Sequence, residues 1–231
     1  MIGFYNYTVI LTFVGVISSL LGIASASLGF IGRAIIFLMV SGLCDMFDGR
    51  VARTRERNEN EKKFGIQLDS LADIICFGVL PVVIGYAILI KKYISPLTTD
   101  WGEVKSLLVN PIPPVIKVAY IIISSLFVLA AIIRLAYFNV MEDERQQLEP
   151  SQPRKYYDGL PVTSVSLLLP IIYLLQKIEA LQNYFHLIYM AALLIIAALF
   201  VIKIKVRKPG LRDMFIFIGI GFVASVVILM L

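Results

Sequence analysis

Four aspartates lie within otherwise apolar stretches of this sequence, and their spacing matches the period of an α-helix. Asp45 and Asp48 are three residues apart, and Asp69 and Asp73 are four residues apart. Residues at these spacings lie on one face of a helix. Carboxylate oxygens suit hard divalent cations, and two such ions can polarise a phosphate and stabilise a departing oxyanion. The four residues therefore predict a site for two divalent ions, Mg²⁺ or Mn²⁺, that serves phosphate chemistry.

Small residues share the helix faces that carry the aspartates. Gly49 and Ala52 continue the first face, and Gly65 begins the second. Counted from residues 53 and 64, the ends of their segments, the four aspartates lie five to nine residues inward. At about 1.5 Å per residue this is roughly 7–14 Å below a membrane surface. A charged aspartate at the centre of a spanning helix costs roughly 2.5–3.5 kcal/mol on insertion scales, so we expect bound cations to neutralise the cluster.

The composition places these helices in a membrane. Hydrophobic residues make up 59% of the 231 residues, charged residues make up 16%, and the mean hydropathy is +0.86. This excludes an ordinary soluble domain, of which about a quarter is charged. We expect an all-α integral membrane protein in one membrane domain. Stretches of about 20 apolar residues predict seven spanning helices, which are residues 8–28, 33–53, 64–90, 115–139, 160–175, 184–202 and 212–231.

Basic residues predict how the helices are oriented. Fifteen of the 21 lysines and arginines fall on one side of the predicted spans. That excess marks the cytoplasmic face, so the N-terminus and the acidic cluster are expected at the cytoplasmic side of the cell membrane. The net charge of +5 is explained by basic loops beside anionic lipid headgroups and requires no nucleic acid. No segment has the pattern of a removable signal peptide.

The two acidic segments together resemble a family signature. The sequence reads DMFDGRVAR at residues 45–53 and GIQLDSLAD at residues 65–73. This resembles the signature of the CDP-alcohol phosphatidyltransferase family, D-x-x-D-G-x-x-A-R followed by G-x-x-x-D-x-x-x-D, with every fixed position present. The spacer at residues 54–64 is longer than usual by about one helical turn. We therefore expect a longer or helical cytoplasmic connection.

Two further segments resemble the phosphatidylserine synthases of this family. They are RLAYFN at residues 134–139 and YDGLP at residues 157–161. The first departs from the RLxRFN pattern at Tyr137, so no role carries over to that position. The resemblance implies a six-helix core over residues 1–208, with residues 209–231 as an additional C-terminal transmembrane helix.

What the resemblance implies is transfer of a phosphatidyl group from CDP-diacylglycerol to L-serine, which releases CMP. The family pattern implies that all four aspartates hold two divalent ions and that Asp73 is also the general base toward the serine hydroxyl. It also implies a homodimer. The residues that it assigns to the CDP-lipid are Asp45, Gly49, Ala52, Arg53, Gly65 and Asp69.

Two residues of the fourth predicted span are candidates for binding serine. Arg134 could grip the serine carboxylate, because a guanidinium binds a carboxylate in bidentate fashion; an anchoring role at the cytoplasmic face is equally consistent with its position. Asn139 is the second candidate, with capping of a helix end as its alternative.

Other functions remain open at this stage. Another phosphatidyltransferase could use glycerol 3-phosphate, inositol phosphate or choline as acceptor. A phosphorylated acceptor requires additional basic residues near the site, and predicted spans four to six offer Arg134 and little else within the membrane. A divalent-cation transporter would also carry membrane carboxylates, but such sites lie near the midplane and are often built from repeats. No repeat is visible here, which favours the transferase.

Overall fold

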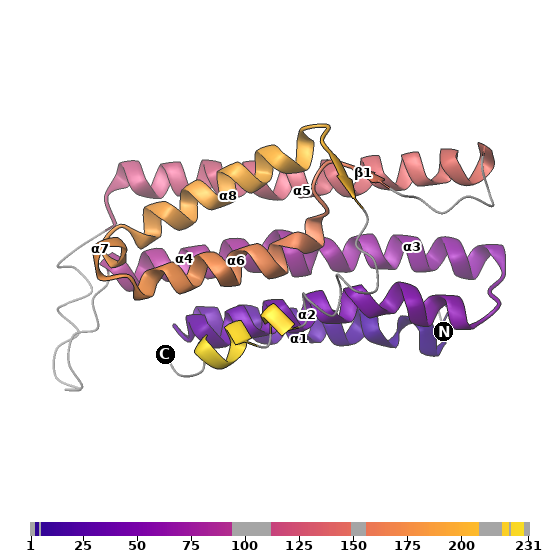
Figure 1. Ribbon diagram of the computed structural model, residues 1–231, viewed down its shortest axis with the longest axis horizontal. Coiled ribbons are helices and arrows are strands. Elements are labelled where there is room, and N and C mark those ends of the chain that lie inside the picture. Colours follow the sequence, from indigo (N-terminus) through magenta and orange to yellow (C-terminus); the bar gives the residue numbers. More distant parts are fainter. Residues whose placement is uncertain are drawn as a thin grey trace.

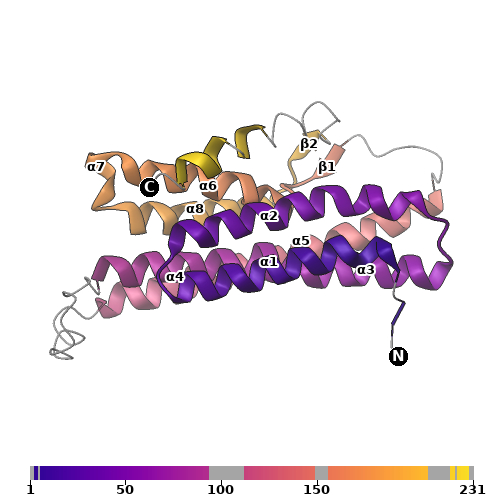
Figure 2. The ribbon, with the colours of Figure 1, turned by 90° about the horizontal axis from the view of Figure 1, so that it is seen from below.

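Long apolar helices that run along a common axis form the described part of the molecule (Figures 1 and 2). A computed structural model describes residues 3–4, 6–93, 112–148, 156–207, 219–221 and 223–228. By length and composition, three of its helices can cross a membrane, Tyr7–Ser27, Glu59–Tyr93 and Pro114–Arg145. The α-helices are α1 (Ile10–Ser27), α2 (Ile31–Val51), α3 (Glu59–Asp73), α4 (Leu80–Tyr93), α5 (Pro114–Leu148), α6 (Val165–Leu174), α7 (Glu179–Gln182) and α8 (Phe185–Val201).

The predicted all-α membrane class is confirmed, and the helices differ from the predicted spans mainly in length. The third span is one continuous helical rod, Glu59–Tyr93, and starts five residues before the predicted 64–90. The fourth, α5, extends nine residues past Asn139. Charged residues at the Glu59 end of the rod and at the Leu148 end of α5 lie outside the apolar stretch that defined the prediction. The predicted seventh span lies largely outside the described residues.

Buried serines join α1 to α2 as an antiparallel pair. Ser41 of α2 donates a hydrogen bond to the backbone oxygen of Gly15 at 2.9 Å, and its hydroxyl also lies 2.8 Å from that of Ser19. Close packing of small residues is typical of helices in membranes. Because Ser41 is one turn from Asp45, this contact fixes the level at which the α2 aspartates face their neighbours.

The α3–α4 rod changes its winding directly after Asp73. Asn58 and Glu61 form a capping box that starts α3, which satisfies its first backbone donors. Residues Ile74–Val79 then form a π-helix, η3, before α4 begins at Leu80. Pro81 has no backbone N–H, and its own carbonyl accepts a hydrogen bond from the Tyr189 hydroxyl at 3.0 Å. The π-helix thus lies between the acidic segment and the apolar remainder of the rod.

A two-stranded ribbon connects the start of α6 with the end of α8. Strand β1 (Tyr156–Asp158) pairs antiparallel with β2 (Lys205–Arg207). Gly159 follows β1 with a φ of +84°, and a Cβ there would lie 3.1 Å from the Phe200 carbonyl oxygen. Only glycine fits this left-handed backbone position without strain.

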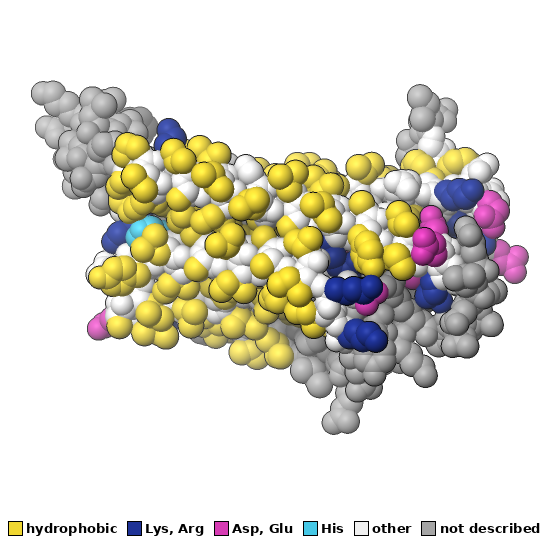
Figure 3. Space-filling model, turned by 90° about the horizontal axis from the view of Figure 1, so that it is seen from above, with side chains coloured by type: hydrophobic (Ala, Val, Ile, Leu, Met, Phe, Trp, Pro, Cys, Tyr) yellow, Lys and Arg dark blue, Asp and Glu magenta, His cyan; other side chains and the backbone are white. Residues whose placement is uncertain are grey.

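Figure 3 shows how the side chains divide along the molecule. Hydrophobic side chains cover most of the visible length, and charged side chains gather toward one end. That end carries the start of α3 and the end of α5 (Figure 1). A hydrophobic exterior with charge at its end is what helices surrounded by lipid require.

Candidate active site in the α1–α3 bundle

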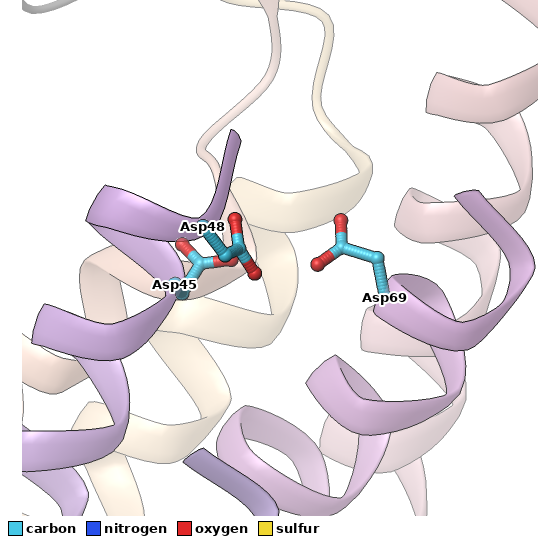
Figure 4. Close-up of side chains that lie close together, drawn as sticks. All are labelled: Asp45, Asp48 and Asp69. Carbon is cyan, nitrogen blue, oxygen red and sulfur yellow. The ribbon is translucent and has the colours of Figure 1, made fainter. Parts of the chain in front are cut away.

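The acidic cluster forms where α2 and α3 face each other. Asp45 and Asp48 project from α2, and Asp69 projects toward them from α3 (Figure 4). One carboxylate oxygen from each of these three lies within 4.8 Å of the others. The predicted meeting of the two helix faces is therefore present in the described structure.

Helix α1 closes the third side of the cluster. The pocket that holds the carboxylates is also lined by Leu11, Thr12 and Gly15 of α1. The Thr12 hydroxyl donates a hydrogen bond to Asp48 Oδ2 at 3.4 Å. Among the described residues, the ion pairs involve none of the four aspartates. The negative charge of the cluster is therefore not cancelled by side chains that the structure describes.

Asp73 lies in the same pocket but is more deeply buried. Only 8% of its surface is exposed, whereas the other three aspartates are half-buried. Its carboxyl faces Asp45 across the helix interface, as Asp69 faces Asp48. It is not part of the group of three whose oxygens lie within 4.8 Å. The pocket thus combines a cluster of three half-buried carboxylates with a fourth that is more deeply buried.

The donor set fits a hard divalent cation. Three carboxylate oxygens at these separations can converge on one ion at the ligand distances of Mg²⁺ or Mn²⁺, about 2.1 Å, after small side-chain rotations. The residues that line the pocket include no histidine, and the sulfur ligands among them are Cys44 and Cys76. Oxygen-only ligation favours Mg²⁺, Ca²⁺ or Mn²⁺ over zinc or copper.

The small residues of the predicted site leave open space at its charged end. A Cβ on Gly49 would meet no neighbour within 4 Å, whereas one on Gly65 would lie 3.3 Å from Arg57 Nη1. Ala52 begins the short helix Ala52–Thr54 that ends α2. Arg53 belongs to this helix, but its side chain lies outside the described residues.

The two candidate serine ligands make contacts within the protein. Arg134 is 5% exposed and donates from Nε to the Leu160 carbonyl oxygen at 3.1 Å. Asn139 donates from Nδ2 to Ser70 Oγ at 2.8 Å. The alternative of helix-end capping for Asn139 is wrong, because α5 continues for nine residues beyond it. The structure brings Asn139 to α3 beside Asp69 and brings Arg134 to the segment after β1.

A comparison with family models decides the relationship of this chain. The model described as CDP-alcohol phosphatidyltransferase matches residues 5–203. The chain belongs to the CDP-alcohol phosphatidyltransferase family.

Several curated proteins are similar to this phosphatidyltransferase-family chain. The CDP-diacylglycerol–serine O-phosphatidyltransferase of Saccharomyces cerevisiae is 33% identical over 64% of the chain, and that of Helicobacter pylori is 28% identical over 73%. The archaetidylserine synthase of Methanothermobacter thermautotrophicus is 27% identical over 72% of the chain. The chain spans about half the length of these relatives, with 44% of the yeast protein and 57% of each of the other two covered.

Three polar residues around the pocket of this phosphatidyltransferase-family protein were not predicted from the sequence. They are Thr12, Ser70 and Arg57, which contact Asp48, Asn139 and the Gly65 backbone region respectively. Thr12 lies in a plain apolar helix, and Ser70 lies beside the aspartate face without sharing it. A signal existed only for Arg57, which falls in the unusually long spacer.

Proposed function

We propose that this protein transfers a phosphatidyl group from CDP-diacylglycerol to the hydroxyl of L-serine, with release of CMP. The observation that carries the proposal is the pocket between α2 and α3, in which three carboxylates converge beside a buried fourth. Family membership supports the CDP-lipid as donor. The names of similar proteins, two of them serine transferases and one an archaetidylserine synthase, support serine as acceptor.

In this proposal the aspartates have two roles. Asp45, Asp48 and Asp69 hold divalent ions, Mg²⁺ or Mn²⁺, with Asp73 completing the set. When bound, these ions supply positive charge that offsets the diphosphate of the lipid and the departing CMP. Asp73 takes the proton of the serine hydroxyl, because a carboxylate within reach of a weak nucleophile assists its attack. The serine oxygen then forms the new bond to the lipid-bearing phosphorus, and the bond from that phosphorus to CMP breaks.

The remaining predicted residues have supporting roles in this scheme. Gly49, Ala52, Arg53 and Gly65 border the space for the cytidine and phosphates. Arg134 and Asn139 remain candidates for contact with serine, and their contacts to Leu160 and Ser70 would then position them. The proposal places the site at the cytoplasmic side of the cell membrane, with the N-terminus inside, and includes the homodimer implied by the family resemblance. It retains residues 1–208 as the core and residues 209–231 as an additional helix.

An acceptor screen tests the proposal. Purified protein in detergent is incubated with CDP-diacylglycerol, Mn²⁺ or Mg²⁺, and one acceptor at a time. CMP release and a new serine-containing lipid are expected with L-serine only. Release with glycerol 3-phosphate, inositol phosphate or choline, and none with serine, contradicts the acceptor assignment. Asp45→Asn should abolish release, whereas Asp143→Asn, which changes an exposed carboxylate at the far end of α5, should retain it.

A further inference from the structure

The connection from α2 to α3 contains one arginine that differs from its charged neighbours. Arg55 pairs with Glu61 at 3.5 Å, and Lys62 pairs with Glu59 at 3.8 Å. Arg57 is half-buried, and among the described residues no carboxylate lies within ion-pair distance of its guanidinium. Its cationic donors are therefore available to a ligand.

Arg57 lies over the helix face that carries the acidic cluster. A Cβ on Gly65 would lie 3.3 Å from Arg57 Nη1, so the missing side chain of this glycine is what makes room for the guanidinium. Gly65 and Asp69 are four residues apart and share one face of α3. The guanidinium therefore lies about one helical turn from Asp69, about 5–6 Å along the helix toward its charged end.

The chemistry of that position suits an oxyanion. A guanidinium presents planar donors that bind phosphate or carboxylate oxygens in pairs. Three converging carboxylates one turn away repel any anionic ligand, so a cation at the entrance offsets that repulsion before the ligand reaches them. Both substrates of the proposed reaction bring an oxyanion, the diphosphate of the CDP-lipid and the carboxylate of serine.

We infer that Arg57 binds a substrate oxyanion at the entrance of the acidic pocket. The inference rests on the proposed function, because the diphosphate and the serine carboxylate are the two oxyanions which that reaction brings to the pocket. Arg57 belongs to the spacer between the two halves of the family signature, where this chain has about one extra helical turn. The contact is therefore a feature of this chain's own connection and not of the fixed signature positions.

Two variants of Arg57 and one matched control test the inference. Arg57→Gln removes the charge and the paired donors, and Arg57→Lys keeps the charge without the planar fork. Lys63→Gln removes one positive charge from the first turns of α3, but this exposed side chain projects roughly 200° around the helix from Gly65. Full-length proteins in detergent are compared by thermal unfolding, which identifies a variant that fails to fold.

The measurements separate the two sources of the oxyanion. They are the Kd for CDP-diacylglycerol without serine, the KM for each substrate, and kcat. Arg57→Gln is expected to raise either the Kd for CDP-diacylglycerol or the KM for serine about ten- to hundredfold. Arg57→Lys is expected to raise the same constant less, and Lys63→Gln is expected to leave it unchanged. A raised Kd for CDP-diacylglycerol identifies the diphosphate, and a raised KM for serine alone identifies the carboxylate.

Other outcomes overturn the inference. If a folded Arg57→Gln protein matches Lys63→Gln in every constant, Arg57 is a surface residue without a role in binding. If the wild type binds CDP-diacylglycerol but transfers nothing to serine, the proposed function fails. The Kd of Arg57→Gln for CDP-diacylglycerol then decides the inference, and a Kd equal to that of the wild type overturns it. If the wild type does not bind CDP-diacylglycerol, both are overturned.

Discussion

Asp73 is distinguished from the other aspartates by where it lies. It is 8% exposed, follows Asp69 by one turn, and stands outside the group of three whose oxygens lie within 4.8 Å. A π-helix begins at the next residue, Ile74, and such irregular turns are frequent at functional sites. A buried carboxylate beside three that converge on a proposed cation site can accept a proton while the others keep their charge.

Replacement of Asp73 by asparagine tests this division of roles. The amide keeps the shape of the carboxyl group but cannot take the serine proton. We expect Asp73→Asn to lower kcat by about 10²–10⁴-fold, with little change in the Kd for CDP-diacylglycerol. Single-turnover CMP release and equilibrium binding measure the two quantities. Unchanged kcat would remove Asp73 as the base, and loss of lipid binding would make it a binding residue.

The residues that could be predicted are those whose pattern lies within one helix. Asp45 with Asp48, and Asp69 with Asp73, share a face by spacing alone, and the structure brings the two faces together. Contacts between helices leave no such trace. The hydrogen bond from Thr12 to Asp48 joins residues 36 apart in the chain, so nothing in either local pattern indicates it.

At the scale of elements, α5 connects the acidic helix to the ribbon. Asn139 bonds to Ser70 on α3, and five residues earlier Arg134 bonds to the carbonyl oxygen of Leu160. Ser70 is turned roughly 100° from Asp69 around α3, so its hydrogen bond with Asn139, the tether, holds the helix from beside the face that carries the aspartates. We expect this contact to set the position of the α3 carboxylates.

Loss of the tether should weaken metal binding before it weakens the fold. Asn139→Ala and Ser70→Ala are each expected to raise the Mn²⁺ concentration at half-saturation about three- to tenfold, because a hydrogen bond contributes about 0.5–1.5 kcal/mol. The double variant should be no worse than either single variant. Bound Mn²⁺ is counted by electron paramagnetic resonance, with Ser125→Ala on the exposed side of α5 as control. Additive effects in the double variant would show that the two residues act independently.

Gly159 is the backbone position on which the ribbon depends. Its φ of +84° and the nearby Phe200 carbonyl both oppose a side chain. Gly159→Ala should therefore destabilise the protein by about 1–3 kcal/mol, seen as a lower unfolding temperature in detergent. Gly219→Ala is the control, since no neighbour lies within 4 Å of the added Cβ. Equal unfolding temperatures for both variants would show that the ribbon tolerates a side chain there.

Among the elements, the boundaries of apolar helices could be predicted from the sequence, whereas the π-helix and the two-stranded ribbon could not. The α1 and α8 boundaries, Ile10–Ser27 and Phe185–Val201, nearly match the predicted 8–28 and 184–202, because apolar composition ends where these helices end. The π-helix Ile74–Val79 interrupts the rod at a point where the apolar composition does not change. The hydrogen bond from Tyr189 to the Pro81 carbonyl, just after it, joins residues 108 apart in the chain. The ribbon depends equally on distant pairing, between residues near 157 and 206.

At the scale of the whole molecule, the carboxylates of the acidic pocket repel one another across the interface between helices. Helices α1 and α2 form one wall of the pocket, α3 forms the other, and no ion pair among the described residues neutralises the carboxylates between them. A ligand that binds only the folded state stabilises it by mass action. A divalent ion should therefore hold the two parts of the bundle together.

Metal removal is the corresponding test. With EDTA the unfolding temperature should fall, and Mg²⁺ or Mn²⁺ at about 100 times its Kd should restore about 2.7 kcal/mol. The double variant Asp45→Asn/Asp48→Asn should be more stable than the wild type in EDTA and should not respond to the metal. Differential scanning fluorimetry measures both. A wild type that is indifferent to EDTA would contradict a metal role for the cluster.

The distribution of charge along the molecule predicts which end faces the cytoplasm. Lys63 lies near the start of α3, at the end where charged side chains gather, and Glu179 lies in α7 at the opposite end (Figures 1 and 3). Basic residues concentrate on the cytoplasmic side of membrane proteins. In intact cells, a membrane-impermeant maleimide should label Glu179→Cys readily, and should label Lys63→Cys only after permeabilisation, with the wild type as control for Cys44 and Cys76. The reverse pattern would place the carboxylates on the outer side, away from the cytoplasmic serine that the proposed reaction consumes.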